Sequence, residues 1–392
     1  MKTFSTSAFL AVMPAVMSSV PTSVWAQGPE DVPPPVLALH AAVTLERDSN
    51  ILRAPDAVSD EIGVFSAGLR LDKRYSLQRF TLQAQANRFR FRDFSNLDYS
   101  TLTYDGAWNL QFTPQLRGVL SADRRQYRDI TNASAASGDV TLRTERREMA
   151  EVTLLGRGGW RTLGGLEQSR SRSDDPRSLE ASPTVSSVHI GGGYEFPSGT
   201  LLTAQVRRGE GDYGAVSSGI EFRETEPSLT LRWPASAKTT LDARIGYLDR
   251  SHDAEPARDF QGLVANGTVR WTYSPRTSVE ADVARDLGSY EFNGGGRIRG
   301  WRLSIAPAWK PSEKTALRLR HTLERRDWQV VSLASPDLGR EDRTHWSALT
   351  FEWTPRRLLE VTVSARQERR RSNLAGLDFR ANVVALGARL NF

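Results

Sequence analysis

Short turns with a neighbouring aromatic residue recur along the chain, and their spacing constrains the fold more than any other feature. Eight such turns lie 35–48 residues apart between Lys73 and Pro355. Six of the ten tryptophans stand just ahead of them: Trp108, Trp160 (before a turn near Thr162), Trp233, Trp271, Trp309 and Trp353. A strand with its connection takes about 20 residues in large barrels, so each period predicts one β-hairpin.

The segments between the turns alternate between apolar and polar residues. In the segment 101–112, Leu102, Tyr104 and Trp108 fall on one face of a strand, while Thr103 and Asp105 fall on the other. Such alternation fits a soluble sandwich, with its apolar face in a core, as well as a membrane barrel, with its apolar face in lipid. The tryptophans favour the barrel, because amphipathic rings gather at a membrane boundary. We expect this girdle at Trp108, Trp233, Trp271, Trp309 and Trp353.

The opposite connections are longer and polar, at residues 129–141, 171–182, 250–259 and 332–343. Eight short turns join sixteen strands, and further strands near 37–47 and 378–392 make eighteen, with 16–18 as the expected range. The sequence therefore predicts an all-β fold, a transmembrane antiparallel β-barrel with short periplasmic turns and longer extracellular loops.

The N-terminus has the pattern of a cleaved secretory signal, with Lys2, an apolar stretch and a cleavage site after Ala26. We assign residues 1–26 to a signal peptide, 27–36 to a Pro-rich segment and 37–392 to the barrel. The last strand alternates up to Phe392 and resembles the terminal signal for barrel assembly. These features predict a Gram-negative outer-membrane location, with membrane lipid as a partner and no access to nucleic acid.

If the apolar face meets lipid, the polar face lines a lumen. Eighteen strands leave room for an aqueous channel. Acidic and basic residues both occur on this face, and Arg is the most frequent of them. These charges either form a network of salt bridges with one another or line a path that conducts ions. The aromatic rings of Tyr127, Tyr247 and Tyr290 fit an outer girdle better than sugar stacking. The candidate lumen residues are Arg117, Arg125, Asp242, Arg244, Glu280, Asp282, Arg318, Arg320, Glu360 and Arg366.

Chemistry on a substrate is not indicated. Cysteine is absent, the five histidines have no metal-ligand spacing, and no Gly-x-Ser-x-Gly motif is present. We therefore expect no catalytic residue, cofactor or metal, and no enzyme activity. Arg supplies all but five of the 52 basic residues. Its planar fork suits sugar acids, although a genomic preference for Arg codons explains the same composition.

Three segments resemble a known barrel family: residues 38–53, 68–80 and 93–125. The resemblance is clearest between residues 38 and 130. The chain is similar there to the exosortase-associated outer-membrane proteins of extracellular polysaccharide biosynthesis. The resemblance implies a passive export channel for an extracellular polysaccharide. It implies periplasmic and inner-membrane polysaccharide-synthesis proteins as partners. From the chemistry of the lumen Arg residues we expect such a channel to favour acidic sugars. A general or solute-selective diffusion porin and a non-transporting structural or assembly barrel are the alternatives.

Overall fold

The computed structural model describes residues 36–129, 140–174, 182–213, 220–290, 296–330, 335 and 337–392. The expected signal peptide and residues 27–35 of the Pro-rich segment lie outside the described residues. Among the residues described, no helix is long and apolar enough to span a membrane. The helical elements in this part of the chain are three single-turn 3-10 helices: η1 (Ser95–Leu97), η2 (Arg157–Gly159) and η4 (Pro256–Arg258).

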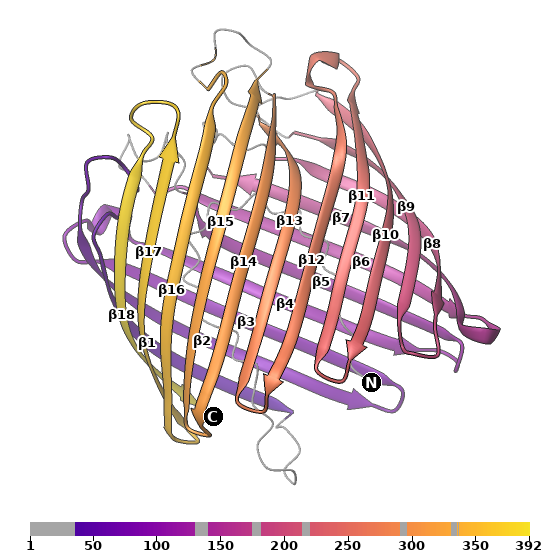
Figure 1. The fold of residues 1–392 in the computed structure, drawn as a ribbon, viewed down its shortest axis with the longest axis horizontal. Coiled ribbons are helices and arrows are strands. Elements are labelled where there is room, and N and C mark those ends of the chain that lie inside the picture. The colour runs from indigo at the N-terminus through magenta and orange to yellow at the C-terminus, as the bar shows by residue number, and fades with distance from the viewer. Residues whose placement is uncertain are drawn as a thin grey trace.

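Eighteen strands make up the described structure (Figure 1). They are β1 (Leu37–Asp48), β2 (Asp60–Tyr75), β3 (Gln78–Phe91), β4 (Tyr99–Gln111), β5 (Leu116–Arg128), β6 (Leu142–Leu155), β7 (Trp160–Ser173), β8 (Thr184–Glu195), β9 (Leu201–Asp212), β10 (Glu221–Ser236), β11 (Thr239–His252), β12 (Phe260–Ser274), β13 (Thr277–Tyr290), β14 (Gly296–Ser312), β15 (Thr315–Val330), β16 (Glu341–Arg356), β17 (Leu359–Ser372) and β18 (Phe379–Asn391).

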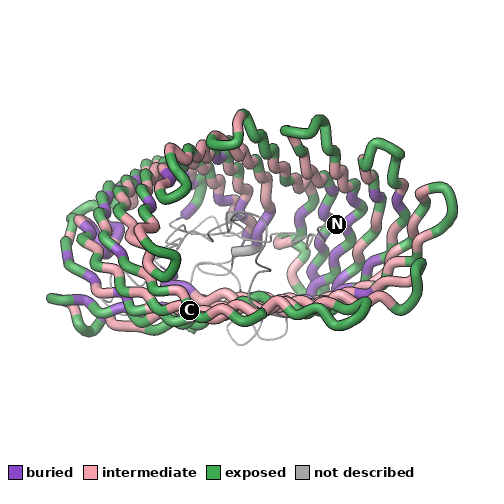
Figure 2. The backbone as a smooth tube through the Cα atoms, turned by 90° about the horizontal axis from the view of Figure 1, so that it is seen from below, coloured by how far each residue is buried: buried purple, intermediate pink, exposed green. Residues whose placement is uncertain are grey.

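Each strand pairs antiparallel with the next one in sequence. The first and last strands also pair, from His40 opposite Asn391 to Asp48 opposite Val383. The sheet is therefore a closed antiparallel barrel, and the predicted fold class and strand number are confirmed. Figure 2, seen along the barrel, shows that the ring of strands is flattened.

The two ends of the barrel differ as predicted. Eight short turns lie at one end, which we call the short-turn end: 76–77, 112–115, 156–159, 196–200, 237–238, 275–276, 313–314 and 357–358. The start of β1 and the end of β18 lie at this end too, because Leu37 pairs with Leu71 near the β2–β3 turn. One turn differs from the prediction, since η2 precedes Trp160 rather than following it. We call the opposite end, with the longer connections, the loop end.

Alternation along each strand divides its side chains between two faces. In β16, Leu349, Phe351 and Trp353 are exposed on the outer face, whereas Glu352 between them is buried on the inner face. Cross-strand partners share a face, so this division extends around the ring. The outer face is a broad apolar surface, which is stable in contact with lipid.

Buried apolar clusters lie inside the barrel toward the loop end. The largest joins β2 and β3 to the adjoining loops and consists of Ile51, Ile62, Val64, Phe89, Phe91 and Leu97. A second cluster contains Val185, Tyr213, Ile220 and Phe222, and a third contains Leu248, Phe260 and Leu287. The wall is therefore packed on its inner side near the loops, while the inner face nearer the short turns is polar.

The closed ladder predicts how the mature protein behaves on a gel. Because every strand has two hydrogen-bonded neighbours, we expect the folded protein to resist SDS until it is heated, with a β-type circular dichroism spectrum. Deletion of residues 379–392 removes β18 and exposes the edges of β1 and β17, so this variant should lose its SDS resistance. A helical spectrum of the full chain, or a truncated chain as resistant as the full one, would contradict the closed barrel.

Candidate functional site: the charged lumen

The inner face holds every candidate lumen residue named from the sequence. The strand registers place them on the side opposite to the exposed apolar residues; Arg318, for example, lies between the outward Leu317 and Leu319 and pairs with Thr350. The same alternation turns the other nine inward: Arg117, Arg125, Asp242, Arg244, Glu280, Asp282, Arg320, Glu360 and Arg366. They come from β5, β11, β13, β15 and β17.

The five girdle tryptophans lie on the outer face near the short-turn end. Their exposed fractions are 41–51%, and they belong to β4, β10, β12, β14 and β16: Trp108, Trp233, Trp271, Trp309 and Trp353. Trp160 joins them from β7, where its ring stands edge-on to that of Tyr194 at 5.1 Å. This arrangement matches the level of a membrane boundary.

A chain of ion pairs crosses the inner face of neighbouring strands, and we call it the lumen ladder. Asp242 of β11 lies 3.9 Å from Arg232 and 2.9 Å from Arg270. Arg270 also reaches Glu280 of β13 at 3.1 Å. Glu280 in turn lies 3.4 Å from Arg320 of β15. The ladder thus runs from β10 to β15, with Arg320 reaching Glu280 across β14.

Two further contacts complete the ladder. Arg320 lies 3.7 Å from Asp282, and Arg318 binds Glu352 of β16 at 2.8 Å. Four arginines therefore meet four carboxylates within the lumen ladder. The side chains of Arg320, Arg270 and Asp242 are 42–47% exposed, so water reaches these pairs and weakens them.

A buried cluster on β9–β11 lies nearer the loop end. Glu224 accepts hydrogen bonds from Arg207 and Arg250, each at 2.5 Å, and is only 2% exposed. Glu226 binds Arg207 at 3.0 Å and also pairs with Arg244. The ring of Phe222 lies 4.1 Å from the guanidinium carbon of Arg250, which completes its apolar surroundings. These charges are paired and enclosed, so the cluster stiffens the wall.

Glycines on the inner face leave space for this cluster. A Cβ at Gly246 would lie 2.7 Å from the Oε1 of Glu226, and one at Gly209 would lie 3.2 Å from the Cγ of Glu224. Sequence reasoning missed Arg207, Glu224 and Glu226. The signal was present, since Phe222, Glu224, Glu226 and Ser228 alternate on the face opposite to Leu229.

Two arginines in loops, Arg53 and Arg340, also form ion pairs with residues of the strands. Arg53, in the loop between β1 and β2, binds Asp48 at 2.8 Å and Glu368 of β17 at 3.0 Å. Burial disfavours its charge, but Glu368 and Asp48 outweigh burial and raise the pKa of Arg53 above its ordinary value. Arg340 binds Asp342 at 2.7 Å and Asp337 at 2.9 Å, with its guanidinium 4.2 Å from the ring of Trp328.

The tyrosines divide between the two faces. Tyr127 is buried on the inner face, where its hydroxyl donates to Glu145 at 2.9 Å, so its assignment to an outer girdle is wrong. Tyr247 is exposed on the outer face, and the side chain of Tyr290 lies outside the described part. The burial of Tyr127 follows from its strand position, which alternates with the outward Leu120.

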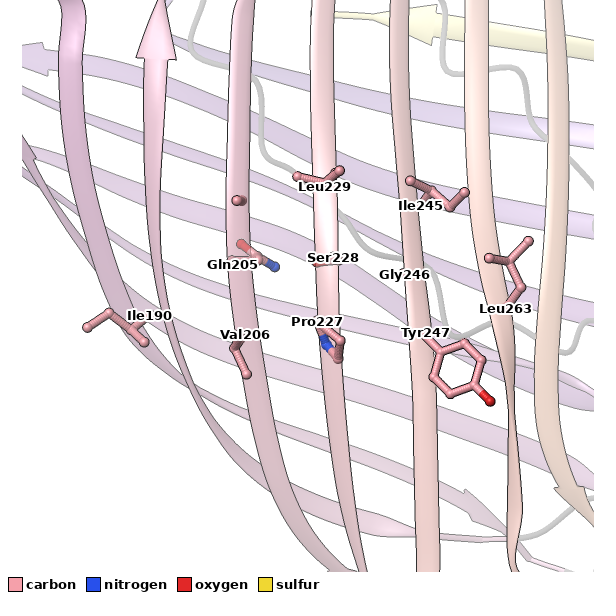
Figure 3. A pocket seen from close by; sticks show the side chains of 11 residues that line it. Ile190, Gln205, Val206, Pro227, Ser228, Leu229, Ile245, Gly246, Tyr247 and Leu263 are labelled. Carbon is pink, nitrogen blue, oxygen red and sulfur yellow. The ribbon is translucent and has the colours of Figure 1, made fainter.

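A depression of about 500 Å³ lies on the outer wall rather than in the lumen. Figure 3 shows its lining, which includes Ile190, Val206, Leu229, Ile245 and Tyr247. It coincides with Pro227, where the pairing of β10 with β11 is interrupted between Thr225 and Ser228. Apolar and facing outward, it fits lipid chains. The described residues bring no three His, Cys, Asp or Glu side chains together as a metal site.

Comparisons with known proteins agree with this architecture. The sequence model of the family described as "Putative beta-barrel porin 2" matches residues 230–392, which include all of β11–β18. Two crystal structures of the Pseudomonas aeruginosa outer membrane protein OpdK, also named OccK1, are similar at a TM-score of 0.50 and 12% identity. Each similarity covers 91% of this chain and 99% of that chain. No curated protein sequence matches the chain.

The chain is thus a porin-like β-barrel, a fold that implies an outer-membrane location. At 12% identity the likeness to OpdK concerns the fold alone. The comparisons do not show the resemblance to exosortase-associated proteins, so polysaccharide export stands as a proposal.

The difference in burial between the two charge groups predicts different costs of mutation. Glu224→Ala leaves Arg207 and Arg250 enclosed without their carboxylate, which costs about 3–5 kcal/mol of folding stability. Asp242→Ala removes an exposed member of the lumen ladder and should cost less than about 1 kcal/mol. Urea unfolding from lipid vesicles, followed by Trp fluorescence, measures both. Equal losses in the two variants would contradict the division into an enclosed and an exposed group.

Proposed function

We propose that this protein is a passive outer-membrane channel for small hydrophilic solutes that carry charge. The lumen ladder carries the proposal: a row of opposite charges along the inner face of a closed barrel of eighteen strands, in which Arg270, Asp242 and Arg320 are exposed to solvent. A barrel of this size is wide enough for an aqueous path. Such charges hold water and ions at the wall, whereas a merely structural lumen fills with packed side chains.

The exposure of the ladder explains how a solute moves along it. A solute carboxylate can replace Glu280 or Asp282 beside Arg320, because these pairs are solvated and each is weak. The guanidinium groups of Arg318 and Arg320 offer the planar, two-pronged geometry that suits carboxylates. A cationic group of a solute can bind the carboxylate of Glu280 or Asp282 that this replacement releases. Movement then follows the concentration gradient in a series of short exchanges along the wall.

The wall also has a fixed part. The enclosed Glu224 cluster, with its hydrogen bonds of 2.5 Å to Arg207 and Arg250, keeps β9–β11 in register while the ladder exchanges partners. A channel needs this combination, because a lumen whose every ion pair opened to solutes would not hold its shape.

Ion selectivity tests the channel. The double variant Arg318→Glu and Arg320→Glu makes the ladder strongly acidic, so planar bilayers should show a shift of permeability toward cations. The matched variant Glu280→Gln and Asp282→Asn leaves the arginines in excess and should shift permeability toward anions. Both variants should keep the heat-dependent gel mobility of the folded barrel. Selectivity that is unchanged in both, with normal insertion, would contradict a conducting ladder and favour a structural or assembly role.

Export of an extracellular polysaccharide is the second candidate. It rests on the resemblance of residues 38–130 to the exosortase-associated family. An exporter of an acidic polymer would use the same inward arginines, together with polysaccharide-synthesis proteins in the periplasm and inner membrane. The two candidates differ in what accumulates when the channel is lost.

A gene deletion separates the candidates. If the chain exports a polymer, its loss should lower secreted polysaccharide and raise the periplasmic pool, and the wild-type gene should restore secretion. The variant with Arg318→Glu and Arg320→Glu should restore it less when the polymer is acidic. Unchanged secretion after deletion, together with slower uptake of small charged solutes, would reject export and leave the diffusion channel.

A further inference from the structure

Exposed arginines gather on the outer face at the loop end, where the lumen argument does not use them. Arg343 of β16, Arg369 and Arg371 of β17 and Arg380 of β18 are exposed and point away from the lumen. The registers place them on the same face as Trp353, Val363 and Val384. We call these four residues the arginine patch.

The register brings these like charges directly opposite one another. Arg343 pairs with Arg371 across β16–β17, and Arg369 pairs with Arg380 across β17–β18. Like charges opposite each other destabilise a sheet. Within the described residues, no carboxylate lies in ion-pair distance of any of the four; the nearby Asp327 and Glu341 bind Arg325 at 3.0 and 3.2 Å. An anion outside the chain would relieve this repulsion.

The height of the patch is set by its distance along the strand from the girdle. Arg343 lies ten residues from Trp353 on β16. At about 3.3 Å per residue and a tilt of roughly 40°, this corresponds to about 25 Å along the membrane normal. Since the apolar band of such barrels is about 25 Å tall, the patch lies at the second membrane boundary. Lipid headgroups occupy this level.

The same pattern recurs on a second wall. Arg124 of β5 pairs with Arg146 of β6, and Arg146 pairs with Arg170 of β7, all on the outer face. Arg170 again lies ten residues from a girdle residue, Trp160. Two separate groups at one height indicate a constraint from the membrane rather than from one loop.

We propose that the arginine patch binds the phosphate groups of lipid headgroups in the leaflet at the loop end. Guanidinium forms paired, planar hydrogen bonds to phosphate, which an ammonium group does not form. A phosphate between Arg343 and Arg371, and another between Arg369 and Arg380, turns repulsion across the ladder into attraction to a shared anion. Solutes in the lumen have no access to this face, so the site is independent of transport.

Native mass spectrometry of the full chain tests this inference, with bisphosphorylated lipid A as the probe and its dephosphorylated form as the comparison. The patch variant replaces Arg343, Arg369, Arg371 and Arg380 with Gln. The control variant replaces four exposed arginines that have carboxylate partners in the structure: Arg47, Arg90, Arg92 and Arg223. Both variants lose the same charge, so a difference between them reports the site.

We expect the patch variant to bind the bisphosphorylated lipid at least ten-fold more weakly than the wild type and the control variant. All three should bind the dephosphorylated lipid alike, and millimolar inorganic phosphate should displace little of the bound lipid. Equal weakening in both variants, or full binding by the patch variant, would overturn the proposal. If the fourfold variant does not fold, the pairs Arg343→Gln with Arg371→Gln and Arg369→Gln with Arg380→Gln serve instead, judged by the same outcomes.

Discussion

Every backbone N–H and C=O group in the lipid region must find its partner within the protein, because the hydrocarbon offers none. The pairing of β1 with β18 meets this requirement for the two strands that would otherwise be edges. Further contacts support the pairing of β1 with β18 at both ends of the barrel. Leu39 and Phe392 exchange backbone hydrogen bonds of 2.8 and 3.1 Å at the short-turn end. Arg53 joins Asp48 of β1 to Glu368 of β17 at the loop end.

The closed barrel also determines where charged side chains lie. With one face given to lipid, the acidic and basic side chains of the strands fall inside the barrel or at the membrane boundaries. Inside, burial separates two kinds of ion pair. Around Glu224 the pairs are enclosed and fix the wall, since any separation leaves an uncompensated charge. Along the lumen ladder several of the paired side chains are 42–47% exposed to solvent. One alternating pattern thus supplies both a rigid frame and a polar path.

Most of the barrel could be predicted from local signals. Period-two alternation gives the face of each residue, and Trp beside a turn gives the end of the hairpin, so the strand number and all ten inward residues follow from neighbours in sequence. The partners in the ion pairs cannot be predicted from neighbours in sequence. Arg207 meets Glu226 because β9 and β10 are registered at that point, and Arg320 meets Glu280 across a whole intervening strand. Register between strands depends on the assembled ring, so the sequence placed these charges on a face without pairing them.

The distribution of arginine follows from the same geometry. A codon preference raises arginine everywhere without regard to partners. In the lumen ladder, however, each arginine faces a carboxylate, whereas in the outer patch arginine faces arginine at a fixed ten residues from the girdle. An arginine of the lumen ladder has its counter-charge within the protein itself. The four arginines of the outer patch lie at a membrane boundary, a level at which a membrane presents anionic lipid groups.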